Sequence, residues 1–100
     1  MEKQIVKYTV ITSKKFEKNF KKLPPDIQRL AKKELEKLET NPKRGEPLKY
    51  DLIGFYSLHF HRNKYRIIYT IKDNTVEILA LSIGKRDDNF YKNLKKELFD

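Results

Sequence analysis

The stretch from Leu58 to Arg86 constrains the fold of this chain more than any other part of it. It consists of three runs rich in β-branched and aromatic residues, separated by two short polar turns, the second of them at 72–74. Runs of this composition favour β-strands. Because links this short cannot make a crossover connection, the sequence predicts three consecutive antiparallel strands.

Alternation along these strands predicts which side chains share a face of the sheet, since successive residues of a strand point to opposite sides. One face receives mostly apolar side chains, namely Tyr56, Leu58, Phe60, Tyr65, Ile67, Tyr69 and Ile71. The opposite face receives Ser57, His59, His61, Arg66 and Ile68, and Lys85 and Arg86 leave the third strand nearby. Two imidazoles and clustered cations on one face suit a phosphodiester ligand, so we expect the functional site there.

The remainder of the chain predicts further elements around this sheet. Residues 5–11 predict a first strand, and Thr12 or Ser13 can cap the helix that follows. Apolar stripes predict two helices separated by Pro24 and Pro25, the second over 26–39, and a short C-terminal helix within 90–99. Residues 41–47 predict a loop. The order β-α-α-β-β-β-α indicates one α+β domain over 1–100, with a mainly antiparallel sheet and a helical hairpin packed on one face.

The charge balance points to a polyanionic partner. The formal net charge is +9, from 23 Lys and Arg against 14 Asp and Glu. A surface rich in Lys and Glu, as in thermophilic proteins, explains many charges but not their imbalance, so nucleic acid or an acidic protein is the expected partner. The chain has no Cys and no apolar run near the length of a membrane span. We therefore expect a cytoplasmic protein that binds no membrane.

Several segments, in this order and in a chain of this length, resemble the RelE/ParE toxin superfamily, and within it the RelE/YoeB-type messenger-RNA interferases. They are the strand followed by residues 13–16, the basic helix ending at Leu23-Pro24, Asn41-Pro42, residues 46–49, 52–57, 65–69 and 82–86, and Tyr91. The resemblance implies the toxin of a type II toxin–antitoxin system. Its partners would be a cognate antitoxin, messenger RNA and the ribosome, with the basic helices contacting ribosomal RNA.

The activity that this resemblance implies is cleavage of messenger RNA in the ribosomal A site, with no metal or other cofactor. The RNA 2′-hydroxyl attacks the adjacent phosphate and the 5′-oxygen leaves, which requires a base, an acid and cations on the phosphorane. Arg66 and Arg86 match family arginines that stabilise the phosphate. Tyr91 matches a C-terminal tyrosine near the site.

The expected base departs from the family pattern. RelE has lysines at the strand positions that here carry Ser57 and His59. YoeB-like members use a glutamate in a Glu-Pro-Leu-Lys segment, present here as residues 46–49, and a C-terminal histidine where this chain has only Tyr91. An imidazole titrates near pH 6.5 and suits acid–base work, so the base stays open between His59 and Glu46. The further expected RNA contacts are Lys49, Ser57, His61 and Lys85.

Each of these assignments has a structural alternative. The two histidines can be a polar, half-exposed strand face, Glu46 a solvated loop charge, and Tyr91 an anchor of the last helix. A His-X-His pair can also hold a metal, but no third ligand has convincing spacing. At the level of function, a ParE-like inhibitor of gyrase is the alternative to the nuclease. A degenerate relative that only binds an antitoxin or DNA is another.

Overall fold

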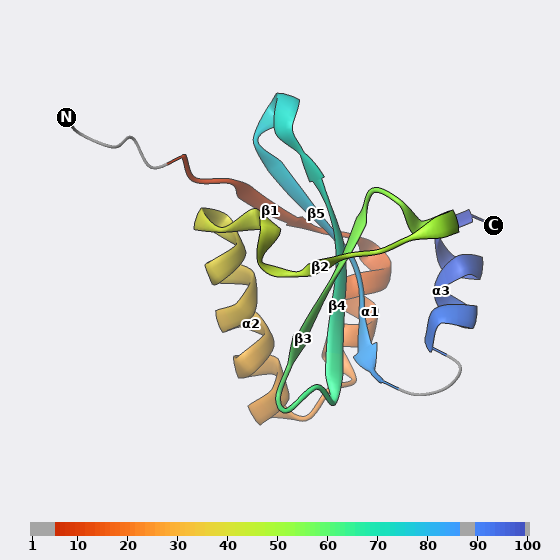
Figure 1. The fold of residues 1–100 in the computed structure, drawn as a ribbon. Coiled ribbons are helices and arrows are strands. Elements are labelled where there is room, and N and C mark those ends of the chain that lie inside the picture. The colour runs from red at the N-terminus through yellow and green to blue at the C-terminus, as the bar shows by residue number, and fades with distance from the viewer. Residues whose placement is uncertain (1–5, 87–89, 100) are drawn as a thin grey trace.

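A five-stranded sheet with the strand order β1-β5-β4-β3-β2 forms the centre of the molecule (Figure 1). The computed structural model describes residues 6–86 and 90–99. The strands are β1 (Thr9–Thr12), β2 (Glu46–Pro47), β3 (Phe55–Phe60), β4 (Tyr65–Lys72) and β5 (Glu77–Lys85), and the helices are α1 (Lys14–Lys21), α2 (Pro25–Thr40) and α3 (Phe90–Phe99). Short 3₁₀ turns lie at Pro42–Arg44, Tyr50–Leu52 and Asp73–Thr75. The predicted α+β fold and the β3–β4–β5 meander are confirmed.

The two outer strands differ from the prediction. The strand β1 begins at Thr9, because the N–H of Tyr8 donates to the carbonyl of Glu39 at the end of α2 (2.7 Å) and not to the sheet. It runs parallel to β5, beside which it forms one edge of the described sheet. The strand β2 lies inside the predicted loop and pairs antiparallel with β3, placing Glu46 opposite Ser57. Two residues with a proline are too short a run to be recognised as a strand from sequence.

The helical hairpin covers one face of the sheet, as predicted. The Ser13 hydroxyl accepts from the N–H of Phe16 (3.0 Å) and so caps α1, and Pro25 occupies the first turn of α2. The buried core joins both helices to the apolar strand face and comprises Phe16, Ile27, Ala31, Leu38, Leu58, Phe60, Ile67, Tyr69, Ile78, Ala80 and Ile83. Burial of these side chains is the main source of the fold's stability.

The third helix packs against the opposite face of the sheet. Leu94 of α3 is buried with Ile68 and Leu52, and Phe55 packs against this smaller cluster. Figure 1 shows α2 and α3 on opposite sides of the sheet. These described contacts of α3 lie toward the Phe55 end of β3, whereas His59 lies toward the other end. Among residues 6–86 and 90–99, no helix is long and apolar enough to cross a membrane.

The turn between β3 and β4 corrects the prediction for His61. The strand β3 ends at Phe60, and the next three residues, His61, Arg62 and Asn63, have left-handed φ values of 51°, 56° and 65°. Strand alternation therefore stops before His61. Its ring lies 6.1 Å from that of Tyr65, on the helix-covered side of the sheet. His61 and His59 do not share a face.

Candidate functional site

Polar side chains gather on the sheet face opposite the helical hairpin, which we call the site face. Two rows of cross-strand partners cross it. One row runs through Glu46, Ser57, Ile68 and Ser82, and the next through His59, Arg66 and Gly84. The alternation predicted for Ser57, His59 and Arg66 is therefore confirmed. The short strand β2 is what brings Glu46 into the first row.

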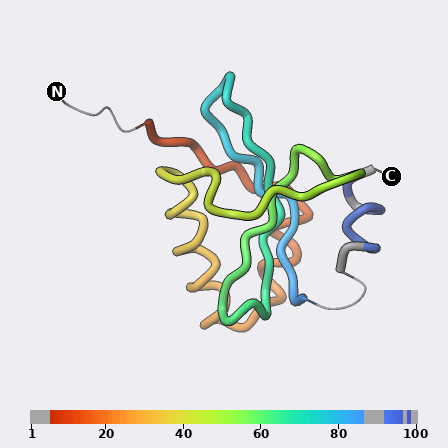
Figure 2. Tube along the Cα trace, viewed as in Figure 1, coloured from red at the N-terminus to blue at the C-terminus, as the bar shows by residue number. Residues whose placement is uncertain are grey.

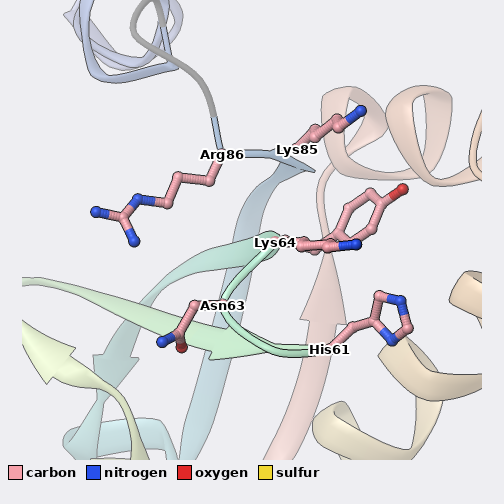
Figure 3. A pocket seen from close by; sticks show the side chains of 6 residues that line it. His61, Asn63, Lys64, Lys85 and Arg86 are labelled. Carbon is pink, nitrogen blue, oxygen red and sulfur yellow. The ribbon is translucent and has the colours of Figure 1, made fainter.

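Arg86 lies two residues beyond Gly84 in the same strand direction, just after the end of β5. Its N–H donates to the carbonyl of Lys64 (2.8 Å), which extends the pairing of β4 with β5 beyond the last strand residue. Figures 1 and 2 show the β3–β4 turn and the end of β5 at the same end of the sheet. In Figure 3, Arg86 extends to one side of this turn, whereas His61 and Lys85 extend to the other. Arg86 is exposed, whereas the Arg66 side chain is only 5% exposed.

The electrostatics of the site face favour a neutral imidazole beside two cations. Burial, and after it the charges of Arg66 and Arg86, lower the pKa of His59, while the Glu46 carboxylate opposes this shift. Burial and the charge of Arg86 likewise lower the pKa of the Arg66 guanidinium. His59 is consequently uncharged at neutral pH and able to accept a proton. An anion bound between the arginines would relieve their mutual repulsion.

A hollow of about 260 Å³ opens beside His59. Its lining residues are Arg44, Gly45, Glu46, Ser57, Leu58 and His59. Ser57 is 2% exposed and its hydroxyl is buried, so it forms part of the floor. The Glu46 carboxylate and the His59 imidazole both border this hollow.

A buried tyrosine holds the segment that carries Glu46. The Tyr69 hydroxyl accepts from the N–H of Gly45 (2.9 Å) and donates to the carbonyl of Pro42 (2.6 Å). Burial raises the pKa of this phenol, so it remains a donor. A Cβ atom at Gly45 would lie 2.8 Å from the Tyr69 hydroxyl oxygen and 3.0 Å from the carbonyl oxygen of Ser57, so only glycine fits this close approach.

An ion pair ties the same segment to α2. One guanidinium nitrogen of Arg44 lies 3.1 and 3.3 Å from the two carboxylate oxygens of Glu34, which is largely covered. Arg44, Gly45 and the Tyr69 hydroxyl were not among the predicted site residues. A glycine between Arg44 and Glu46 was the available signal, whereas the pattern of β4 assigns Tyr69 to the core and says nothing of its hydroxyl.

The remaining predicted site residues lie apart from this hollow. His61 and Lys85 line a second hollow of about 410 Å³ at the β3–β4 turn. Lys49 is exposed just before the 3₁₀ turn that begins at Tyr50, and it lines neither hollow. Tyr91 belongs to α3, but its side chain lies outside the described part of the structure. Within the described ranges, no three His, Cys, Asp or Glu residues form a group that could hold a metal ion.

Comparison with known proteins gives a family match over most of the chain. The sequence profile of a family described as ParE-like toxins of type II bacterial toxin–antitoxin systems matches residues 10–95. No curated protein sequence matches the chain significantly.

Solved structures share the fold. The toxin–antitoxin complex RelBE2 from Mycobacterium tuberculosis contains a chain with a TM-score of 0.74 and 29% identity, and the match covers 87% of this chain and all (100%) of that one. The isolated RelE toxin of E. coli gives a TM-score of 0.67 at 21% identity, covering 91% and 99%. The archaeal RelE–RelB complex from Pyrococcus horikoshii gives a TM-score of 0.64 at 22% identity, covering 82% and 98%.

Proposed function

Because this chain belongs to the ParE-like toxins of type II bacterial toxin–antitoxin systems, within the RelE/ParE superfamily, we propose that it is a ribosome-dependent endoribonuclease that cleaves messenger RNA without a metal. The observation that carries this proposal is the convergence of Glu46, His59, Arg66 and Arg86 on one sheet face, close enough for their charges to interact. A role on ribosomes implies a cytoplasmic protein.

The reaction is an internal transesterification of RNA. The 2′-oxygen forms a bond to the adjacent phosphorus, the bond from phosphorus to the 5′-oxygen breaks, and the products carry a 2′,3′-cyclic phosphate and a 5′-hydroxyl. Neutral His59 accepts the 2′-hydroxyl proton, and the departing 5′-oxygen takes a proton from water. In the alternative arrangement Glu46 is the base and protonated His59 is the acid. The lowered pKa of His59 favours the first arrangement at neutral pH.

The two arginines stabilise the charge that develops on the phosphorane. Arg86 is exposed and can contact the phosphate directly, with its planar fork matched to two oxygens. Arg66 lies beneath the surface and acts mainly through its charge, which already reaches His59. Groups of this kind matter more to rate than to binding, because the added charge exists only in the transition state.

The test is single-turnover cleavage of a translated messenger RNA on ribosomes, followed by primer extension. We expect Arg86→Ala to lower the rate by about 100-fold or more, the scale found when a charge-stabilising donor is removed. Arg29→Ala removes the same charge from an exposed position of α2, away from the site face, and measures how much of the effect comes from a lost helix charge alone. Cleavage by Arg86→Ala at the parent rate would refute the proposed mechanism.

The family description also favours a second candidate function, inhibition of gyrase in the manner of ParE-type toxins. This alternative needs no base. It therefore predicts that the double variant His59→Ala, Glu46→Ala stays toxic and inhibits supercoiling by purified gyrase. The nuclease predicts loss of toxicity in the same variant and no effect of the parent protein on gyrase.

We also infer a cognate antitoxin, because two of the related structures are toxin–antitoxin complexes. The net charge of +9 suits an acidic or amphipathic segment, with association that is fast and sensitive to salt. Such a segment silences the toxin by covering or distorting the face of Arg66 and Arg86. A complex with the product of the adjacent gene that still cleaves at the parent rate would contradict this mechanism.

A further inference from the structure

The turn at His61, Arg62 and Asn63 has a backbone conformation that needs an explanation. All three residues are left-handed, a region that residues other than glycine rarely adopt and that is unusual for three in succession. Asparagine and histidine tolerate it better than most residues. Backbone strain of this kind is concentrated at sites that bind ligands.

The left-handed turn sends the His61 ring away from His59 and onto Tyr65. The two rings lie 6.1 Å apart at an angle of 45°. Tyr65 is the cross-strand partner of Lys85. The turn thus gathers two aromatic rings and a lysine on the side of the sheet end that faces away from His59.

These side chains line the second hollow, together with Asn63, Lys64 and Arg86 (Figure 3). Its volume of about 410 Å³ exceeds that of the hollow beside His59. No carboxylate is among its described lining residues, whereas three of them are Lys or Arg. Arg86 borders this hollow and also interacts with the charges of the site face. Arg86 therefore lies near both places.

We propose that this hollow is a subsite for a nucleotide of single-stranded RNA that neighbours the cleaved phosphodiester. The inference rests on the proposed function, which supplies the RNA strand. The base stacks on the rings of His61 and Tyr65, and its phosphate lies between Lys64 and Lys85. Rings and cations together are the combination that proteins use for unpaired nucleotides. An acidic peptide would bind the cations but would have no group that stacks on the two rings.

The experiment is a fluorescence-anisotropy titration with a labelled heptaribonucleotide that carries a 2′-O-methyl group at every position. This RNA has no attacking hydroxyl, so binding is measured without cleavage. Lys85→Gln removes a subsite cation. Lys72→Gln makes the same change at the far, exposed end of β4 and is the matched control. His61→Asn removes the ring and keeps a residue that tolerates the left-handed conformation. Thermal unfolding checks that each variant is folded.

We expect Lys85→Gln to reduce the slope of log affinity against log salt by about 0.7, the value for one contact with a single-stranded phosphate, whereas Lys72→Gln leaves the slope close to that of the parent. His61→Asn should weaken binding by about five-fold or more at every salt concentration, because stacking is not ionic.

Three results would overturn the subsite. They are equal effects of Lys85→Gln and Lys72→Gln, parental affinity in His61→Asn, and displacement of the RNA by a polyglutamate peptide whose own binding needs Lys85 but not His61. The last result would assign the hollow to an acidic protein. The binding experiment does not test the cleavage mechanism. That mechanism fails if Arg86→Ala cleaves messenger RNA on ribosomes at the parent rate.

Discussion

Removal of a single oxygen atom from Tyr69 is expected to loosen the segment that carries Glu46. The side chain is 0% exposed, and its hydroxyl bonds both Gly45 and Pro42. Phenylalanine fills the same space, so Tyr69→Phe changes the hydrogen bonds and leaves the packing of the ring intact.

The size of the effect follows from the two backbone groups that lose their partner. A buried donor or acceptor left unsatisfied costs about 1–3 kcal/mol. Pro42 is half-buried, so its carbonyl can turn toward water, whereas Gly45 is buried. The costs of the two groups add to about 2–6 kcal/mol if both stay unsatisfied. Because the Pro42 carbonyl can bind water, we expect the free energy of unfolding to fall by about 2–3 kcal/mol.

Urea unfolding measures this loss, and Tyr56→Phe provides the control. Tyr56 is half-buried and stacks on Tyr69 at 5.3 Å, and its hydroxyl makes no hydrogen bond to any described residue. Its loss should change the free energy of unfolding by less than about 0.5 kcal/mol, as is usual away from such features.

A second measurement tests whether Tyr69 also positions Glu46 relative to His59. The Glu46 carboxylate raises the pKa of His59 against the other influences on it. If Tyr69 positions Glu46, Tyr69→Phe lowers the pKa of His59 in an NMR titration, as Glu46→Gln does, and the double variant adds little. Unchanged stability, or lost stability with an unmoved His59 titration, would refute the positioning role.

The remaining predictions concern the core, the cap and the pH dependence. Leu38→Ala should lower the free energy of unfolding by about 2–5 kcal/mol in urea, because this leucine is 0% exposed; a loss under about 0.5 kcal/mol would contradict the packing. Ser13→Ala should cost about 1–2 kcal/mol, because the hydroxyl caps α1 and donates to the carbonyl of Leu81 (3.0 Å); an unchanged midpoint would exclude the cap. Cleavage should rise with pH through an inflection below the ordinary histidine value of about 6.5, since the pKa of His59 is lowered and its neutral form reacts. The inflection should move still lower in Glu46→Gln and disappear in His59→Ala, and its survival in His59→Ala would identify another base.

Periodicity was sufficient to predict most of the fold and the sheet face on which Ser57, His59 and Arg66 lie. Alternation places Ser57, His59 and Arg66 on one face, because strand geometry leaves a side chain only two directions. The apolar stripes of the helical hairpin likewise have one face to bury. Where the backbone is regular, the prediction needs no knowledge of distant contacts.

The misses occur where a distant contact decides the local structure. The prediction that His61 shares a face with His59 is wrong because the backbone becomes left-handed at His61. A pattern of residue types does not encode this change. The strand β2 forms because Glu46 and Pro47 pair with β3. Tyr69, on a different strand, holds the preceding loop through its hydrogen bond with Gly45. The parallel pairing of β1 with β5 depends on residues far along the chain.

This last pairing bears on how the protein is made. Thr9 lies beside Glu77, and Thr12 beside Ala80, so the first strand has no place in the sheet until residue 80 has been synthesised. While the ribosome makes the chain, α1 and α2 emerge with their apolar stripes uncovered, since the strands that cover them follow later. Arg86 comes after the final strand. A nascent chain therefore completes the site face only after the residues up to Arg86 have left the exit tunnel, and until then the sheet lacks both its first strand and this arginine.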